Sequence, residues 1–259
     1  CFAHSVRCYV SPKISDIILM GSERIHLFDT PLLVSRNMGL AVDQRAAKRV
    51  MDILISGIGI IITSPIMLII AIAVKAYDRG PVFYFQDRLT LGGKPFKICK
   101  FRSMCVDSEK NGARLASKHD SRITPVGHVL RNLHLDELPQ LFNVFKGDMS
   151  LVGPRPERES IMLEYEKELP EFYYRLKVKA GLTGYAQVYG KYNTTPYDKL
   201  KLDLFYIENY SFLLDIKLIF MTVKIFFQKE VSEGVDDRQV NALKDSGKNV
   251  GVSENKTEE

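Results

Sequence analysis

The chain has 259 residues, of which 46% are hydrophobic and 26% are charged, and its formal net charge is +5. A mean hydropathy of −0.07 excludes a polytopic membrane protein, and the length allows one large domain or a domain with appendages. The positive charge favours an anionic partner. It does not support nucleic acid, because the sequence has no basic helix, zinc-ligand spacing or aromatic RNA-binding motif. The four cysteines show no CxxC spacing and indicate free thiols in a reducing compartment.

Residues 1–40 alternate short apolar runs with polar turns. This pattern is typical of the end of an α/β unit that has no complete core of its own. Because the chain begins with Cys1 and not with Met, we expect an upstream part of a longer protein to be missing. At the other end, residues 231–259 are polar and predict a disordered tail.

The most apolar segment, 53–74, contains no charged residue. As a helix it would be roughly 33 Å long, which is about the hydrocarbon thickness of a bilayer. Two simple interpretations are a transmembrane helix and a buried core helix. We favour the transmembrane helix of the two, because core helices of this length usually carry polar residues.

Two features favour a third interpretation of this segment. Pro65 follows Ser64 near its middle, where a proline removes a backbone donor and bends or breaks a helix. Basic residues also flank the segment on both sides, whereas a spanning helix is expected to have them in excess on one side; they are Lys48, Arg49, Lys75 and Arg79. We therefore predict a re-entrant helix-break-helix hairpin over 48–75, in which the Thr63 and Ser64 hydroxyls bond freed backbone groups.

The remaining segments predict a small α/β catalytic domain within residues 41–230, so the fold class is α+β. The pattern at residues 78–104 predicts a β-hairpin around a Gly-Gly turn, and the polar stretch at residues 107–122 predicts a mobile loop. Helical patterns cover 125–146 and 157–176, with a stop near Pro170. Residues 211–227 are apolar but interrupted by charges, which is typical of an amphipathic helix in the membrane interface or on the domain.

Asp136 and Glu137 are adjacent carboxylates within a leucine-rich stretch. An ordinary alternative is a helix end with both side chains at the surface and Arg131 as an exposed partner. The flanking leucines leave no clear solvent face for the pair, and the GPRP corner at 153–156 presents Arg155 rigidly. A divalent cation on one carboxylate would relieve the repulsion and leave the other as an ionised nucleophile. Two arginines would suit a diphosphate.

From about residue 48 to residue 227 the chain resembles the bacterial sugar transferases, the monotopic polyprenyl-phosphate phosphoglycosyl transferases. The resemblance rests on several stretches that occur in order, "KRVMDILISG", the Ser64-Pro65 break, "GPVFYFQDRLTLGGKPFKICKFRSM", "DSRITPVGHVLRNLHLDELPQLFNVFKGDMSLVGPRPE", "KAGLTGYAQVYGK" and "KLDLFYIENYSFLLDIKLIF". Residues 1–40 resemble the end of the nucleotide-fold-like domain that precedes the catalytic domain in longer members.

This resemblance implies the roles of individual residues. Asp136 matches the nucleophile, Glu137 a magnesium ligand, and Arg131 and Arg155 match arginines that contact phosphate. Asp203 matches an acidic residue needed for catalysis, which would position or activate the acceptor phosphate.

Other positions stay open. Lys100 and Arg102 are either solvated strand residues or phosphate contacts, and we expect His134 to have a packing or supporting role and not to act as a base. Tyr185 and the Tyr189-Gly190-Lys191 stretch depart from the family pattern, which leaves the sugar and uridine contacts undefined.

The resemblance implies a two-step transfer of a sugar 1-phosphate from a UDP-sugar to polyprenyl (undecaprenyl) phosphate, through a covalent aspartyl intermediate and with release of UMP. We expect Mg²⁺ as cofactor and a location at the cytoplasmic face of the inner membrane, at the start of exopolysaccharide, capsule or O-antigen synthesis. The alternatives are a catalytically silent membrane-anchored scaffold and a metal-dependent hydrolase of lipid diphosphates. The sugar, the polyprenyl length and the oligomeric state, a homo-oligomer included, stay open.

Overall fold

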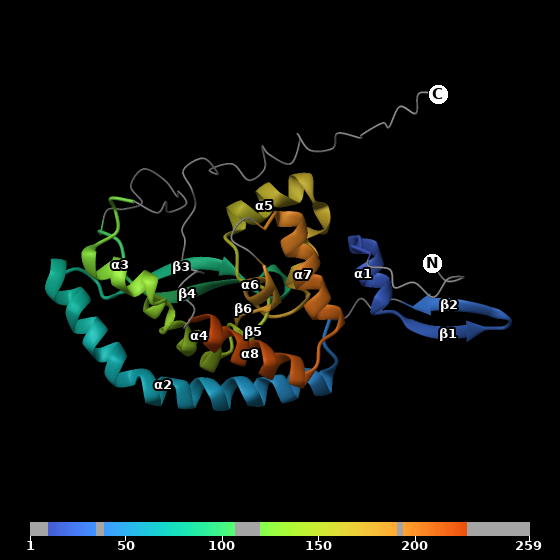
Figure 1. Cartoon of the computed structure of the whole chain (residues 1–259), viewed down its shortest axis with the longest axis horizontal. Helices are drawn as coiled ribbons and strands as arrows, with labels where there is room; N and C mark the ends of the chain where they lie inside the picture. Colours follow the sequence, from blue (N-terminus) through green and yellow to red (C-terminus); the bar gives the residue numbers. More distant parts are fainter. Residues whose placement is uncertain (1–9, 35–38, 107–119, 191–193, 227–259) are drawn as a thin grey trace, which may run out of the picture.

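The computed structural model describes residues 10–34, 39–106, 120–190 and 194–226. The predicted tail at 231–259 and most of the predicted loop at 107–122 lie outside the described residues. The fold is α+β, as expected: in the described residues, helices pack around two small two-stranded sheets, and a third, N-terminal sheet lies to one side (Figure 1). The elements in chain order are α1 (Ile14–Met20), β1 (Glu23–Leu27), β2 (Thr30–Val34), α2 (Val42–Asp78), β3 (Phe83–Leu89), β4 (Pro95–Phe101), α3 (Pro125–Asn132), α4 (Gln140–Lys146), β5 (Ser150–Val152), α5 (Glu159–Glu168), β6 (Gly181–Thr183), α6 (Tyr185–Tyr189), α7 (Pro196–Glu208) and α8 (Phe212–Phe226).

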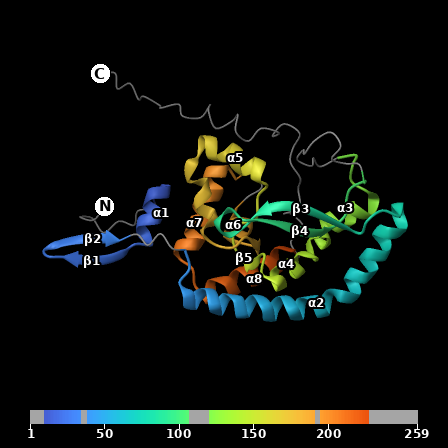
Figure 2. The same cartoon turned by 180° about the vertical axis from the view of Figure 1, so that it is seen from behind.

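The N-terminal piece contributes one helix to the main core and one hairpin to the surface. Ile14 and Ile17 of α1 are buried in the same core as Leu200 and Leu204 of α7. The β1–β2 hairpin is antiparallel, every residue of β2 is exposed, and the hairpin extends away from the rest of the fold (Figures 1 and 2).

The predicted hairpin at 78–104 is confirmed. Strands β3 and β4 pair antiparallel, from Phe83 opposite Phe101 to Leu89 opposite Pro95. Gly92 and Gly93 have φ values of 68° and 74° in the connecting turn, a region that side chains with a Cβ rarely adopt.

The helical pattern at 125–146 is interrupted in the structure. After α3 the chain passes through His134, whose φ of 53° is left-handed, into a short 3-10 helix at Leu135–Glu137, and only then into α4. The pattern at 157–176 likewise divides into α5 and a 3-10 helix at Pro170–Lys177, so the predicted stop near Pro170 is confirmed.

Helix α2 contains the whole apolar segment and stays helical through Pro65, so the structure has one bent helix where the sequence predicts two helices separated by a break (Figure 1). The reason lies in the local hydrogen bonds. Pro65 cannot donate to the Ile61 carbonyl, and the Ser64 hydroxyl donates to that carbonyl instead, at 2.8 Å. The Thr63 hydroxyl donates to the Gly59 carbonyl at 2.7 Å. The predicted role of the Ser64 hydroxyl is therefore confirmed, whereas the Thr63 hydroxyl bonds a carbonyl that Pro65 does not free.

The two parts of α2 pack on different elements. The first part lies against α4, where Gly57 and Gly59 allow close approach by Phe145 and Leu141. The second part buries Met67, Ile70 and Val74 with residues of β4 and α3. In the most apolar stretch of α2, only 17% is buried within the protein, and the helix is long and apolar enough to cross a membrane. A helix with this much exposed apolar surface is suited to membrane association.

The side chains before the apolar segment correct one part of the flanking-charge argument. Lys48 is buried and forms an ion pair with Asp215 of α8, with 2.5 Å between Nζ and Oδ2. Arg49 donates to the Val144 and Phe145 carbonyls at the end of α4, each at 2.8 Å. Both cations hold α2 on the domain. Lys48 is neutralised there and is not a free flanking charge, whereas Arg49 bonds backbone carbonyls and keeps its charge.

Candidate active site

Local chain geometry places the two adjacent carboxylates where α3 ends. The Thr124 hydroxyl caps the start of α3 by accepting from the Gly127 amide at 2.9 Å. The left-handed turn at His134 then redirects the chain, and the following 3-10 helix carries Asp136 and Glu137. Left-handed geometry is uncommon outside glycine, so this turn is a specific feature of the site.

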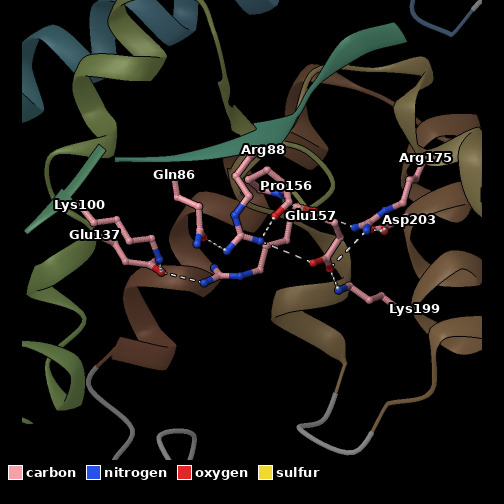
Figure 3. A network of polar contacts seen from close by, with 10 residues as sticks. Gln86, Arg88, Lys100, Glu137, Pro156, Glu157, Arg175, Lys199 and Asp203 are labelled. Atoms are coloured by element: carbon pink, nitrogen blue, oxygen red, sulfur yellow. Dashed lines mark hydrogen bonds and ion pairs between the residues drawn. The ribbon is translucent and has the colours of Figure 1, made fainter. Parts of the chain in front are cut away.

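Glu137 is held by two cations from different parts of the chain. Its Oε1 atom lies 2.6 Å from Lys100 Nζ of β4 and 2.7 Å from an Arg155 guanidinium nitrogen (Figure 3). Burial alone would raise the pKa of Glu137, but Arg155 and Lys100 outweigh it and hold that pKa well below its usual range. Glu137 is therefore ionised at neutral pH. The Arg155 side chain is 44% exposed and can reach a ligand as well.

Asp136 is the more buried carboxylate, with 8% of its surface exposed. Burial raises its pKa, Lys100 opposes the rise and Glu137 adds to it. Arg131 and His134 also act on this carboxylate through space, and Arg131 is held by a hydrogen bond of 2.9 Å from its Nε to the Ser103 hydroxyl. A buried, weakly solvated carboxylate among cations is an arrangement that suits a nucleophile.

A second network fixes the corner that carries Arg155. Arg175 donates to the Arg155 carbonyl at 2.9 Å and pairs with Asp203, with 2.8 Å between Nη2 and Oδ2. The Glu157 carboxylate contacts Lys199 and lies 3.5 Å from Arg175 (Figure 3). Burial by itself would raise the pKa of Glu157, but Lys199 and Arg175 outweigh it and lower that pKa to about 2.

The structure thus brings Lys100 and Arg155 into direct contact with Glu137, and it places Arg131 near enough to Asp136 to act on it through space. Asp203 is 1% exposed and belongs to the Arg175 network, so it reaches the acidic pair only through Arg175 and Arg155. Arg102 is also buried and pairs with Asp78 at the end of α2. Arg102 therefore joins the end of α2 to the residue that follows β4.

Sequence reasoning missed Arg175 and Lys199. Lys199 and Asp203 are spaced i,i+4 in the helix α7 and so share one face, which is a signal that the sequence contains. Arg175 has no such signal, because its partners lie in two segments that are distant from it in the sequence, the corner at 155–157 and the helix α7.

The donor set fits a magnesium ion only together with a substrate. Among the described residues, no group of three or more His, Cys, Asp or Glu side chains could hold a metal ion. Mg²⁺ is usually held by one or two carboxylates and substrate phosphates. Adjacent carboxylates such as Asp136 and Glu137 meet that requirement, with phosphate oxygens as the missing ligands.

Comparison with known proteins identifies the family of the chain. A model of the bacterial sugar transferase family matches residues 43–229, and the chain belongs to that family. The match includes α2, the acidic pair and the Arg175 network.

Several curated proteins are similar to the chain. A UDP-N-acetylgalactosamine-undecaprenyl-phosphate N-acetylgalactosaminephosphotransferase of Aeromonas hydrophila is 46% identical over 68% of this chain and 43% of its own length. A UDP-glucose:undecaprenyl-phosphate glucose-1-phosphate transferase of Klebsiella pneumoniae is 43% identical over 78% of this chain and 43% of its own length. A protein of the same name from Caulobacter vibrioides is 37% identical over 83% of this chain and 84% of its own length. The chain thus spans less than half the length of the first two relatives.

Proposed function

We propose that the protein is a phosphoglycosyl transferase that moves a sugar 1-phosphate from a UDP-sugar to undecaprenyl phosphate. The observation that carries the proposal is the buried Asp136 carboxylate beside Glu137, which Lys100 and Arg155 hold ionised. The names of the relatives support the donor and acceptor classes. They differ in the sugar, so the sugar stays open.

In the first step, an Asp136 oxygen forms a bond to the β-phosphorus of the UDP-sugar. The bond from that phosphorus to the bridging oxygen breaks, and UMP leaves with the electron pair. In the second step, a phosphate oxygen of undecaprenyl phosphate attacks the same phosphorus and releases the Asp136 carboxylate, which gives undecaprenyl diphosphate sugar. Phosphoryl transfer depends on positioning and charge neutralisation. Three cationic side chains provide both at this site: Lys100, Arg131 and Arg155.

Magnesium is the proposed cofactor. Glu137 would hold it beside Asp136, and phosphate oxygens of the donor would complete its coordination. When bound, Mg²⁺ neutralises charge on the diphosphate and stabilises the leaving group. Lys100 and Arg155 both contact the Oε1 atom of Glu137. A metal ion bound at this carboxylate would therefore share the negative charge of Glu137 with both cations.

Asp203 acts, in this proposal, as a positioning residue. Asp203 orients Arg175, and Arg175 donates to the Arg155 carbonyl. This contact fixes the position of Arg155, whose side chain reaches Glu137. Asp203→Asn should therefore slow both half-reactions. A variant that keeps the first half-reaction at full rate and loses only the second would instead assign Asp203 to the acceptor phosphate.

The membrane arrangement that we propose is re-entrant, with both ends of α2 at the cytoplasmic face of the inner membrane. The bend of α2 (Figure 1), the proline within that helix and its exposed apolar surface support it. In a cysteine-free background, Ala46→Cys and Tyr77→Cys should both be unreachable by a membrane-impermeant thiol reagent in intact cells. Labelling of Ala46→Cys from outside would indicate a spanning helix.

The decisive experiment measures UMP release. Enzyme mixed with UDP-sugar and no acceptor should release up to one UMP per active site and then stop, and steady-state kinetics with both substrates should be ping-pong. Asp136→Asn should abolish the burst, whereas Asp198→Asn, an exposed change on α7, should retain it. Intersecting double-reciprocal lines without a burst would indicate direct transfer. Absence of UMP release from intact protein with both substrates would indicate the scaffold alternative.

A further inference from the structure

A cavity of about 290 Å³ lies between the first turns of α2 and the segment that leads into β6. Its charged lining residues are Arg45, Lys48, Arg49, Lys177, Lys179 and the single acid Asp52. Glu137 and its two partners in the proposed active site, Lys100 and Arg155, are not among the residues that line the cavity. The cavity is therefore separate from the proposed active site.

The positive charge of the cavity is only partly neutralised. Lys48 pairs with Asp215, which lies outside the lining. Arg49 and Lys179 donate to backbone carbonyls at the end of α4, and a carbonyl accepts a hydrogen bond without cancelling the charge of its donor. Arg45 likewise donates to the Leu40 carbonyl, at 2.7 Å.

Asp52, the only acid among the described lining residues, already has hydrogen-bond partners. It accepts from the Ser150 hydroxyl at 3.0 Å and from the Leu151 amide at 2.9 Å. Asp148 and Glu208 act through space on Lys179 and Lys177 but do not line the cavity. Burial contributes most to lowering the pKa of Lys179, the charge of Arg49 lowers it further, and Asp52 and Asp148 oppose both effects.

The cavity also lies at a defined position relative to the apolar part of α2. Its four α2 residues, from Arg45 to Asp52, directly precede the uncharged stretch that begins at Ile53. At a rise of 1.5 Å per residue, Arg45 lies about 12 Å and Arg49 about 6 Å along the helix from Ile53. The polar layer of one leaflet is roughly 5–8 Å thick, so the cavity reaches headgroup depth if Ile53 enters the hydrocarbon.

We propose that this cavity binds the phosphate headgroup of an anionic membrane lipid and so fixes α2 at the surface of the bilayer. Basic pockets beside membrane helices on the cytoplasmic side are suited to such headgroups, and guanidinium groups match phosphate oxygens. The apolar lining residues Leu40, Leu91 and Val178 provide a surface for the glycerol and the first acyl carbons. The inference rests on the membrane insertion of α2 in the proposed function, but it does not depend on the transfer reaction.

The test is native mass spectrometry of the detergent-purified protein titrated with short-chain phosphatidylglycerol. The cavity variant is Arg45→Gln with Lys177→Gln, which leaves the Arg49 and Lys179 contacts with α4 in place. The charge-matched control is Lys97→Gln with Lys167→Gln, two exposed positions outside the lining. We expect one tightly bound lipid in the wild type and the control, and at least about tenfold weaker binding in the cavity variant.

Equal phosphatidylglycerol binding by the cavity variant and the control would overturn the proposal. Two competitors decide the source of the phosphate. If inorganic phosphate displaces the lipid at equal concentration, the site takes a soluble anion and the lipid assignment is wrong. If the cavity variant loses binding of a polyprenyl phosphate and not of phosphatidylglycerol, the site belongs to the substrate. The UMP burst, measured on the same samples, tests the proposed reaction separately.

Discussion

A substitution at Glu157 measures the importance of the Arg155 corner, because the Glu157 carboxylate lies at the centre of the buried Arg175 network. It contacts Lys199 and Arg175, and Arg88 of β3 lies 3.8 Å away. The change Glu157→Gln keeps the size of the side chain and removes its charge. Arg175 would then keep Asp203 as a partner, whereas Lys199 would lose its carboxylate.

The expected magnitude follows from the pKa of this carboxyl group. It falls from the ordinary 4.5 to about 2 in the folded protein. At about 1.4 kcal/mol per pH unit, this difference corresponds to a contribution on the order of 3 kcal/mol to the free energy of unfolding. Because the folded pKa is depressed, the contribution is fully present above pH 4.5 and is lost as the pH falls through about 2.

The assay is thermal and denaturant unfolding in detergent, followed by circular dichroism between pH 7 and pH 2. Glu157→Gln should lower the free energy of unfolding at pH 7 by about 3 kcal/mol and should flatten the loss of stability below pH 4.5. Glu159→Gln, an exposed change two residues away, is the control and should do neither.

The same variant should affect the reaction, because the corner positions Arg155. A misplacement of about 1 Å at such a site can cost up to about 100-fold in rate. We therefore expect Glu157→Gln to slow the UMP burst strongly. A variant with wild-type stability, wild-type pH dependence and an unchanged burst would refute the reasoning.

Three further changes test other parts of the structure. Asp215→Asn leaves the buried Lys48 without its counter-charge and should lower the free energy of unfolding by about 3–5 kcal/mol, measured by denaturant unfolding; a loss below about 1 kcal/mol would contradict a dry ion pair. Pro65→Ala restores a donor to the Ile61 carbonyl, so α2 should straighten. Ala46→Cys should then become reachable from outside the cell, and turnover should be lost. Unchanged labelling would show that the membrane topology does not depend on the bend. Glu137→Gln should lower the rate and raise the magnesium concentration needed for half-maximal activity, whereas an unchanged magnesium titration would exclude this residue as a ligand.

Local patterns in the sequence predicted the parts of this protein that local forces determine. The Gly-Gly turn between two alternating runs predicts the β3–β4 hairpin, because only a few turns join such strands. The proline in the apolar segment predicts a break, but the helix continues through it, because the neighbouring serine satisfies the freed carbonyl as predicted. The acidic pair among leucines marks the site, because adjacent buried carboxylates are costly without a compensating charge.

The pairing of charges was decided only by the tertiary structure. Lys100 is 37 residues from Glu137 in the sequence, and Lys48 is 167 residues from Asp215. A basic residue next to an apolar segment looks the same in the sequence whether it faces a lipid headgroup or a buried carboxylate. Which of the two it meets depends on how α2, α4 and α8 pack, and that packing is set by many apolar contacts between distant segments, for which periodicity and local propensity carry no information.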